Sequence, residues 1–312
     1  MEVARQAERT VLGRTPKKNK RIDKNRYGYY FLVPFAVIFI VFNLYPILYT
    51  FYLSMTSYDG LNKPEFVGLA NYVTLARDPL FYQAFYNTVK IWIVGFIPQI
   101  TMALIIAYTF TIAKVKGAAL FKAVYYVPNL VTAATIGVLF SAILGFPNGL
   151  LNQLLLQWNL IDGPMNFLTM PHFTQNTIAA INWWMWFGNN MLICLAGMSA
   201  ISNDYYEAAK IDGANLAKIF TSITLPLMKP ILLYLMLTSF IGGLQLFDLA
   251  QVMTDGMGAP NNALNTLVLY LYNQGFVFNN FGYSSAIAYG MFMIILVFSC
   301  ILFLLSYRKK VR

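Results

Sequence analysis

Charged residues are scarce in this chain: only 11% of its 312 residues are Asp, Glu, Lys or Arg, whereas 58% are hydrophobic. Soluble domains are typically about 25% charged and about 45–50% apolar. A fold in water could not hide so much apolar surface. A soluble protein is therefore excluded, and the lipid bilayer is the expected solvent.

Residues that carry chemistry are also few. There is one histidine, His172, which we expect to be a structural loop residue, and the two cysteines, Cys194 and Cys300, both lie in apolar stretches. This pattern predicts neither a disulfide framework nor a metal site. The chain has no G-x-x-x-x-G-K-[ST] loop for nucleotide phosphates, no paired carboxylates and no Ser/His/Asp set. We therefore expect that it is not an enzyme and binds no cofactor itself.

Six apolar stretches are each long enough to cross about 30 Å of hydrocarbon. They cover about 29–54, 84–112, 121–144, 177–199, 231–253 and 284–306. The sequence thus predicts an all-α integral membrane protein with six transmembrane helices over 29–306. Basic tails at 1–28 and 307–312 flank this domain. The first apolar run is too long for a signal-peptide core, so we expect it to stay uncleaved.

Positive charge is distributed unevenly between the two sides of this topology. Nineteen of the 22 Lys and Arg residues fall in the two tails, in the loop between spans 2 and 3, or between spans 4 and 5. The nineteen are Arg5, Arg9, Arg14, Lys17, Lys18, Lys20, Arg21, Lys24, Arg26, Lys114, Lys116, Lys122, Lys210, Lys218, Lys229, Arg308, Lys309, Lys310 and Arg312. The positive-inside rule then makes both termini cytoplasmic. It also accounts for the net charge of +10 without a nucleic-acid partner.

A polar stretch at about 202–230 lies between spans 4 and 5. Asp204 with Glu207 three residues later predicts a capping box at the start of a helix, and Gly213 can adopt the positive φ that ends it. A second short helix is expected over 214–223. This helix-turn-helix would have an exposed polar face, which is typical of a docking element. An amphipathic hairpin lying on the membrane surface is the alternative.

We expect the second short helix to be closed off by two prolines, Pro226 and Pro230.

Span 4 carries polar and aromatic side chains at helical spacing. Trp186, Asn189 and Asn190 lie on neighbouring faces of the predicted helix. Indoles stack on sugar rings and amides pair with hydroxyls, so this set suits a carbohydrate site. Alternatively, the tryptophan packs and the amides hold helices together.

Span 5 offers a second polar stripe. Ser239, Gly242, Gly243 and Leu246 share one face, and Gln245 lies beside them. The glycines would make room for a ligand or, alternatively, permit close helix packing.

Asp248 is the sole acidic residue deep within a predicted span. Such a carboxylate is by default a functional hypothesis. We expect it to be a gate or a structural residue near the outer end of span 5.

Several motifs occur together and in order. FVGLANY, YYVPNL and LFDLAQVMTDG accompany an EAA…DGA…LP series in the stretch between spans 4 and 5. The residues of that series are Glu207, Ala208, Ala209, Asp212, Gly213, Ala214, Leu225 and Pro226. It resembles the EAA motif of permease subunits in binding-protein-dependent ABC importers. From about Tyr29 to its end, the chain resembles carbohydrate permeases of the maltose-permease-like type.

The resemblance implies a transport complex in the cytoplasmic membrane of a bacterium or archaeon. The partners would be a second homologous permease, two ATPase subunits that bind ATP and Mg, and an extracytoplasmic solute-binding protein. ATP-driven motion of the coupling loop would drive alternating access for a mono- or oligosaccharide. Contacts with the sugar would come from Met185, Trp186, Asn189, Ser239, Gly242, Gly243 and Leu246, to which the polar pattern adds Asn190 and Gln245.

Three alternatives stay open at this point. The solute could be a glycerol-phosphate compound. The chain could be an ion-coupled carrier that uses Asp248, or a membrane receptor or scaffold that binds without flux.

Overall fold

The computed structural model describes residues 24–113 and 115–308. Several of the basic residues expected on the cytoplasmic side lie outside the described residues. These are Arg5, Arg9, Arg14, Lys17, Lys18, Lys20, Arg21, Lys114, Lys309, Lys310 and Arg312. The chain forms two compact units, Met1–Thr50 and Phe51–Arg312.

The first unit is built from the amino-terminal helix. α2 (Lys24–Phe39) continues through a π-helical turn, η1 (Ile40–Leu44), into α3 (Tyr45–Ser54), whose residues from Phe51 onward belong to the second unit. Large apolar side chains occur on every side of this helix, and Phe31 and Phe35 are exposed. A helix that is apolar all round is expected in lipid.

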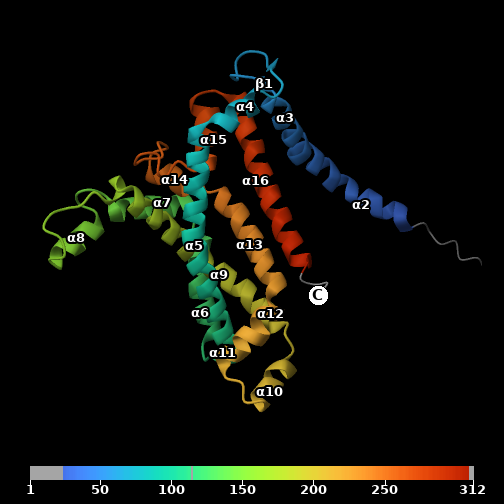
Figure 1. Ribbon diagram of the computed structural model, residues 1–312, viewed down its shortest axis with the longest axis vertical. Helices are drawn as coiled ribbons and strands as arrows, with labels where there is room; N and C mark the ends of the chain where they lie inside the picture. Colours follow the sequence, from blue (N-terminus) through green and yellow to red (C-terminus); the bar gives the residue numbers. More distant parts are fainter. Residues whose placement is uncertain (1–23, 114, 309–312) are drawn as a thin grey trace, which may run out of the picture. The chain divides into compact units, whose positions relative to one another are not determined.

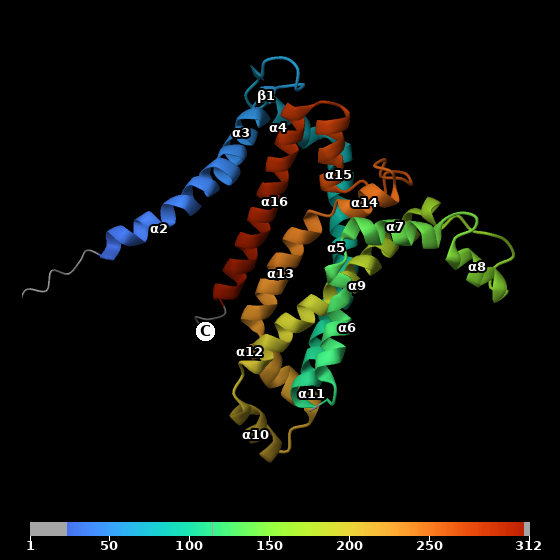
Figure 2. The ribbon, with the colours of Figure 1, turned by 180° about the vertical axis from the view of Figure 1, so that it is seen from behind.

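The second unit is almost entirely helical. Its elements are β1 (Thr56–Ser57), β2 (Glu65–Phe66), α4 (Ala70–Arg77), α5 (Pro79–Ile112), α6 (Ala118–Leu130), α7 (Ala133–Leu144), α8 (Leu150–Gln157), η2 (Phe167–Thr169), α9 (Pro171–Ser199), α10 (Asn203–Ile211), α11 (Leu216–Ile219), η3 (Phe220–Thr224), α12 (Leu225–Leu227), α13 (Lys229–Leu244), α14 (Asp248–Met253), α15 (Leu267–Tyr272), η4 (Asn273–Val277) and α16 (Phe281–Arg308). β1 and β2 form one short antiparallel ladder, with Thr56 opposite Phe66. Figures 1 and 2 show α10 and α11 at one end of this unit and α4 at the opposite end.

Membrane-crossing potential differs among the helices. Among the described residues, four stretches are long and apolar enough to cross a membrane, namely Tyr29–Ser54, Pro79–Ile112, Lys229–Met253 and Phe281–Ser306. The pair α6 and α7 makes a fifth if it forms one crossing. α9 is 29 residues long but does not join this set, since its amide side chains lower its hydropathy. The chain is thus an all-helical membrane protein, and a six-span topology stays a prediction.

The third predicted span is broken, which corrects the expectation of one helix over 121–144. α6 and α7 meet at 88°. α6 ends at Leu130, two residues after Pro128, and the Thr132 side chain accepts a hydrogen bond from the Thr135 backbone N–H to cap a new helix. A proline near the end of one helix and a cap at the start of the next favour two helices over one.

α5 and α9 form the most extensive helix pair of the second unit. At Gly95 of α5, a Cβ would lie 2.9 Å from the Ala179 carbonyl oxygen of α9. At Gly188 of α9, a Cβ would lie 1.9 Å from the Tyr125 carbonyl oxygen of α6. Glycine at both positions lets the backbones approach closely, as is common between membrane helices.

Polar side chains hold the amino-terminal parts of α5 and α9 together. The Gln175 side chain on α9 donates to Asn87 Oδ1 on α5 at 3.1 Å and to the Ala263 carbonyl at 2.8 Å. It also accepts from Lys90 Nζ at 2.7 Å, and Lys90 lies 3.3 Å from His172 Nδ1. The prediction that His172 is a loop residue is wrong, because it lies in the first turn of α9.

Candidate functional site

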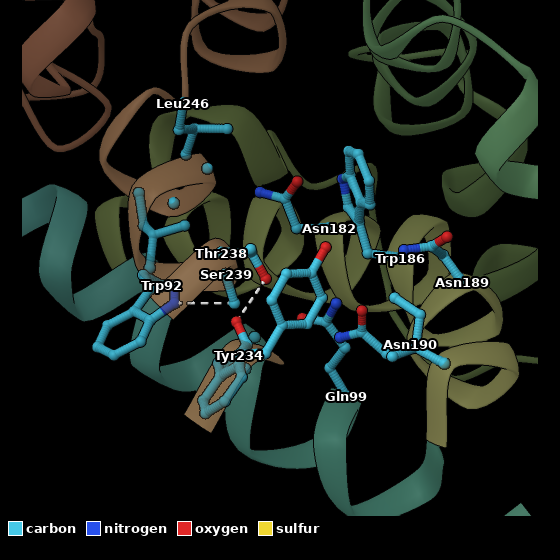
Figure 3. Close-up of a pocket in the computed structure, with 16 residues that line it drawn as sticks. Trp92, Gln99, Asn182, Trp186, Asn189, Asn190, Tyr234, Thr238, Ser239 and Leu246 are labelled. Atoms are coloured by element: carbon cyan, nitrogen blue, oxygen red, sulfur yellow. Dashed lines mark hydrogen bonds between the residues drawn. The ribbon is translucent and has the colours of Figure 1, made fainter. Parts of the chain in front are cut away.

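A cavity of about 310 Å³ opens between α5, α9 and α13. Its size falls at the lower end of small-molecule sites, which are roughly 300–1,000 Å³. Figure 3 shows side chains from the three helices pointing into this space. The sixteen lining residues are Ile91, Trp92, Gly95, Phe96, Gln99, Asn182, Trp186, Asn189, Asn190, Ile193, Tyr234, Thr238, Ser239, Gly242, Gly243 and Leu246.

The structure brings together seven of the nine residues predicted for substrate binding. The seven are Trp186, Asn189, Asn190, Ser239, Gly242, Gly243 and Leu246. The other two lie elsewhere: Met185 is packed into a hydrophobic cluster with 4% of its side chain exposed, and Gln245 is an exposed residue that follows the end of α13.

Helical spacing explains the contribution of α9. Asn182, Trp186, Asn189 and Ile193 follow one another at three or four residues and so share one face of the helix. Asn190 lies at the edge of that face and is 6% exposed. Trp183 and Trp184, which belong to the same aromatic run, do not line the cavity.

The two glycines of α13 have different surroundings. At Gly243 a Cβ would lie 2.4 Å from the Trp92 ring, whereas at Gly242 it would meet nothing within 4 Å. The packing interpretation therefore fits Gly243, and the room-making interpretation fits Gly242. The Trp92 indole N–H also donates to Ser239 Oγ at 3.1 Å, so Ser239 helps to fix this ring (Figure 3).

Sequence reasoning missed the wall that α5 supplies. Trp92, Phe96 and Gln99 of this helix line the cavity, together with Tyr234 and Thr238 of α13. A glutamine in the middle of an otherwise apolar span was the available signal for this wall, because such a group in lipid is costly.

Four carboxamides in the cavity are not engaged with protein groups. Gln99, Asn182, Asn189 and Asn190 make no side-chain hydrogen bond with any other residue that the structure describes. Each carboxamide carries two N–H donors and an acceptor oxygen. The cavity therefore presents free donors and acceptors beside the exposed ring of Trp186.

The polar stretch before α13 forms the expected hairpin, but its caps differ from the prediction. Ser202, and not Asp204, is the N-cap of α10: its Oγ accepts from the Asp204 backbone N–H at 3.3 Å. The serine lies one residue before α10, whereas Asp204 is already in the first turn. Gly213 has φ +73° after the helix, as predicted.

The second half of the hairpin also differs from the prediction. Asn215 caps α11 by accepting from the Lys218 backbone N–H at 2.8 Å, and the chain stays helical through η3 and α12. Pro226 and Pro230 lie in the first turns of α12 and α13 and so do not end a helix. Proline is tolerated at the start of α13, because an N–H in a first turn has no intrahelical partner. Pro226 instead lies in α12, which follows directly on the π-helical turn η3.

The hairpin has one packed face and one exposed face. Tyr206 and Ala209 pack with Ile219 in a small apolar cluster. The remaining residues of the predicted coupling set are exposed, apart from half-buried Leu225; they are Glu207, Ala208, Asp212, Gly213 and Pro226. Ile211 is 86% exposed at the turn, although it is a large apolar residue.

Asp248 does not lie deep in a helix, which corrects that expectation. α13 ends at Leu244 and α14 begins at Asp248, so the carboxylate is exposed in a first turn and does not line the cavity. A first-turn acid is favoured by the partial positive charge at a helix start.

Comparison with known proteins identifies the class. The family described as binding-protein-dependent transport system inner membrane component matches residues 19–312. The chain belongs to this family, and the resemblance predicted from its motifs is confirmed. It is therefore a permease subunit, and as such a transport component and not an enzyme.

Individual relatives are similar along almost their whole length. The chain is 36% identical over 284 residues to the lactose transport system permease protein LacF of Rhizobium radiobacter, covering 91% of this chain and 95% of that protein. It is 36% identical over 285 residues to the arabinooligosaccharides transport system permease protein AraP of Bacillus subtilis (strain 168), covering 91% and 90%.

The fold has a solved counterpart. The chain superposes with a TM-score of 0.79 on a bacterial ABC transporter involved in the import of the acidic polysaccharide alginate, at 22% identity, covering 93% of this chain and 98% of that one. Membership of this family decides against an ion-coupled carrier and against a receptor or scaffold.

Proposed function

We propose that this permease subunit conducts a sugar across the cytoplasmic membrane through the cavity between α5, α9 and α13. The observation that carries the proposal is the lining itself, where unpartnered carboxamides lie beside the exposed ring of Trp186. Aromatic faces and amides are what a carbohydrate site needs. The names of the two relatives, which refer to lactose and arabinooligosaccharides, support the same class of solute.

The proposed topology has six spans over residues 29–306. They are α2 with α3, α5, α6 with α7, α9, α13 with α14, and α16. In this topology α9 crosses the bilayer with Asn182, Asn189 and Asn190 turned toward the cavity, where they avoid lipid. The basic tails at 1–28 and 307–312 are cytoplasmic, and so is the hairpin at about 202–230.

The hairpin is proposed to be the coupling loop. Its exposed face, with Glu207, Asp212 and the apolar Ile211, suits a cleft on a partner protein. The proposed partners are two ATPase subunits that carry ATP and Mg, a second homologous permease and an extracytoplasmic solute-binding protein. Closure of the ATPases would move the hairpin and switch the cavity between inward-facing and outward-facing states.

Uptake of labelled sugar by cells that express the whole transporter tests this proposal. In Gly213→Pro the residue cannot reach the positive φ of the turn, because proline fixes φ near −65°. In Glu207→Ala an exposed carboxylate is lost without any change in packing. We expect both variants to insert into the membrane and to lose uptake.

The matched control is Asp162→Asn, which removes an exposed carboxylate from the loop between α8 and α9. It should transport normally. Normal ATP-driven uptake in both hairpin variants would contradict the coupling role.

A further inference from the structure

The lining of the cavity carries no charge. None of the sixteen lining residues is Asp, Glu, Lys, Arg or His. Their polar groups are four carboxamides, the hydroxyls of Tyr234, Thr238 and Ser239, and two indoles. The nearest cation along α5 is Lys90, next to the lining residue Ile91, and its ammonium group is already bound by Gln175 and His172.

A carboxylate or phosphate in such a site would lack a counter-ion. Proteins recognise these groups with Arg or Lys, and an unpaired charge in a poorly solvated site is strongly disfavoured. A neutral hydroxyl, which both donates and accepts, finds complementary partners in a carboxamide. The uncharged, hydrogen-bonding lining therefore favours neutral over anionic solutes of the same size.

One carboxamide comes from a helix that the sugar-site prediction did not include. Gln99 of α5 is 7% exposed, lines the cavity across from α9, and has no hydrogen-bond partner among the described residues. Its amide oxygen and nitrogen are accessible from the cavity, so a solute there can hydrogen-bond them. Ser239, by contrast, is bonded to Trp92 and is therefore a positioning residue for that ring.

We infer that the cavity binds neutral sugars, that it rejects sugars bearing a carboxylate or phosphate, and that Gln99 hydrogen-bonds a hydroxyl of the bound sugar. This inference rests on the proposed function, and it adds the class of sugar and a third helix to the contact set.

The test uses the complete transporter, reconstituted with its binding protein, and a panel of neutral disaccharides (lactose, maltose, trehalose and arabinobiose). The disaccharide with measurable uptake is then compared with its monodeoxy analogues and with its uronic acid. Quenching of tryptophan fluorescence in the permease–ATPase complex without the binding protein reports binding at the cavity directly, since Trp92 and Trp186 line it.

The decisive variant is Gln99→Leu, with Gln99→Asn as the conservative change and Gln157→Leu, at the exposed end of α8, as the matched control. We expect Gln99→Leu to weaken sugar binding about 3- to 10-fold, the loss of one neutral hydrogen bond. In the wild type, one deoxy analogue should bind about 3- to 10-fold more weakly than the parent sugar, and in Gln99→Leu this difference should vanish. A purely structural role would weaken all analogues equally.

The outcomes separate the two proposals. If no disaccharide is taken up, the sugar-import proposal fails, and this inference fails with it. If uptake occurs but the deoxy discrimination survives in Gln99→Leu, the contact by Gln99 is wrong while sugar import stands. If the uronic acid quenches as strongly as the neutral sugar in the complex without binding protein, the neutral selectivity is overturned.

Discussion

Two polar clusters lie along the same helix pair, α5 and α9, and they differ in how their groups are satisfied. Near the amino-terminal ends of the two helices, in what we call the Gln175 cluster, the Gln175 amide donates to Asn87 and Ala263 and accepts from Lys90. In the cavity, Gln99 and Asn190 are about as buried, yet neither bonds to another described residue.

This difference distinguishes a cluster that stabilises the fold from a cavity that can bind a solute. A buried polar group in a native protein is almost always paired, because leaving it unpaired costs about 1–3 kcal/mol. The Gln175 cluster meets this requirement within the chain and so fixes α5 against α9. The cavity amides can form hydrogen bonds only with solvent or a ligand, as the side chains of a site for a polar solute must.

The largest expected effect on stability comes from removing Gln175, whose hydrogen bonds hold the Gln175 cluster together. Gln175→Leu leaves Asn87 Oδ1 and the Ala263 carbonyl without a partner, and it leaves Lys90 with His172 alone. We expect a loss of about 3 kcal/mol in the free energy of unfolding. Thermal unfolding of the purified transporter should show it as a drop of about 5 °C or more in Tm.

The same variant should not change the KM for the sugar, because Gln175 does not line the cavity. Gln157→Leu serves again as the control and should leave both Tm and KM unchanged. A raised KM with an unchanged Tm for Gln175→Leu would reverse the assignment of the two clusters.

Substitutions at the two glycines of α13, Gly242 and Gly243, should change stability by smaller amounts and again distinguish a packed position from an open one. In Gly243→Ala the new methyl group meets the Trp92 ring, so we expect a loss of about 1–3 kcal/mol from overpacking. In Gly242→Ala it enters open space, and the better helix propensity of alanine should raise stability by about 0.5–1 kcal/mol. Tm values of the two variants, measured side by side, check both signs.

Sugar uptake provides a second test, which concerns the cavity-lining Gly242. Gly242→Ala narrows the cavity and should lower the affinity for a trisaccharide more than that for a disaccharide. An equal change for both sugars would argue that Gly242 does not limit the space for the ligand.

Much of this arrangement could be predicted from periodicity. The stripes at Trp186 and Asn189 and at Ser239 and Gly242 were visible because side chains at three- and four-residue spacing share a helical face. The turn at Gly213 followed from its freedom to adopt a positive φ.

The rest depends on contacts between helices that are distant in sequence. Periodicity places Met185 beside Trp186, but only packing shows that it joins the hydrophobic cluster. The bend after Leu130 depends on the Thr132 cap. At the helix break before Asp248, the Leu246 carbonyl accepts from the distant Thr266 hydroxyl. An apolar run conceals both features. Gln99 was a sequence signal for the α5 wall, but only packing shows that it faces α9 and α13.

The smallest expected effect concerns a third polar contact, at the starts of α5 and α16, in which one side chain again bonds to several groups. Asp78 caps α5 by accepting from the Leu80 backbone N–H at 2.9 Å, and it also accepts from the hydroxyls of Tyr270 on α15 and Tyr283 on α16. Burial alone would raise the pKa of Asp78, but the hydrogen bonds from Tyr270, Tyr283 and the Leu80 N–H outweigh it and hold the pKa below its usual value. Burial, and then the bond to Asp78, raise the pKa of Tyr270 to about 12.

The signs define a pH window. The stabilisation from Asp78 is present above the ordinary carboxyl pKa and is lost as the pH falls through its lowered pKa, whereas that from Tyr270 is complete below pH 10 and is lost as the pH rises toward 12. Tyrosinate absorbance at 295 nm should show a step near pH 12 that is missing in Tyr270→Phe. In Asp78→Asn this step should move only part of the way toward pH 10, because burial is the larger cause and survives the substitution. A complete return to pH 10 would mean that the carboxylate, and not burial, sets the pKa of Tyr270.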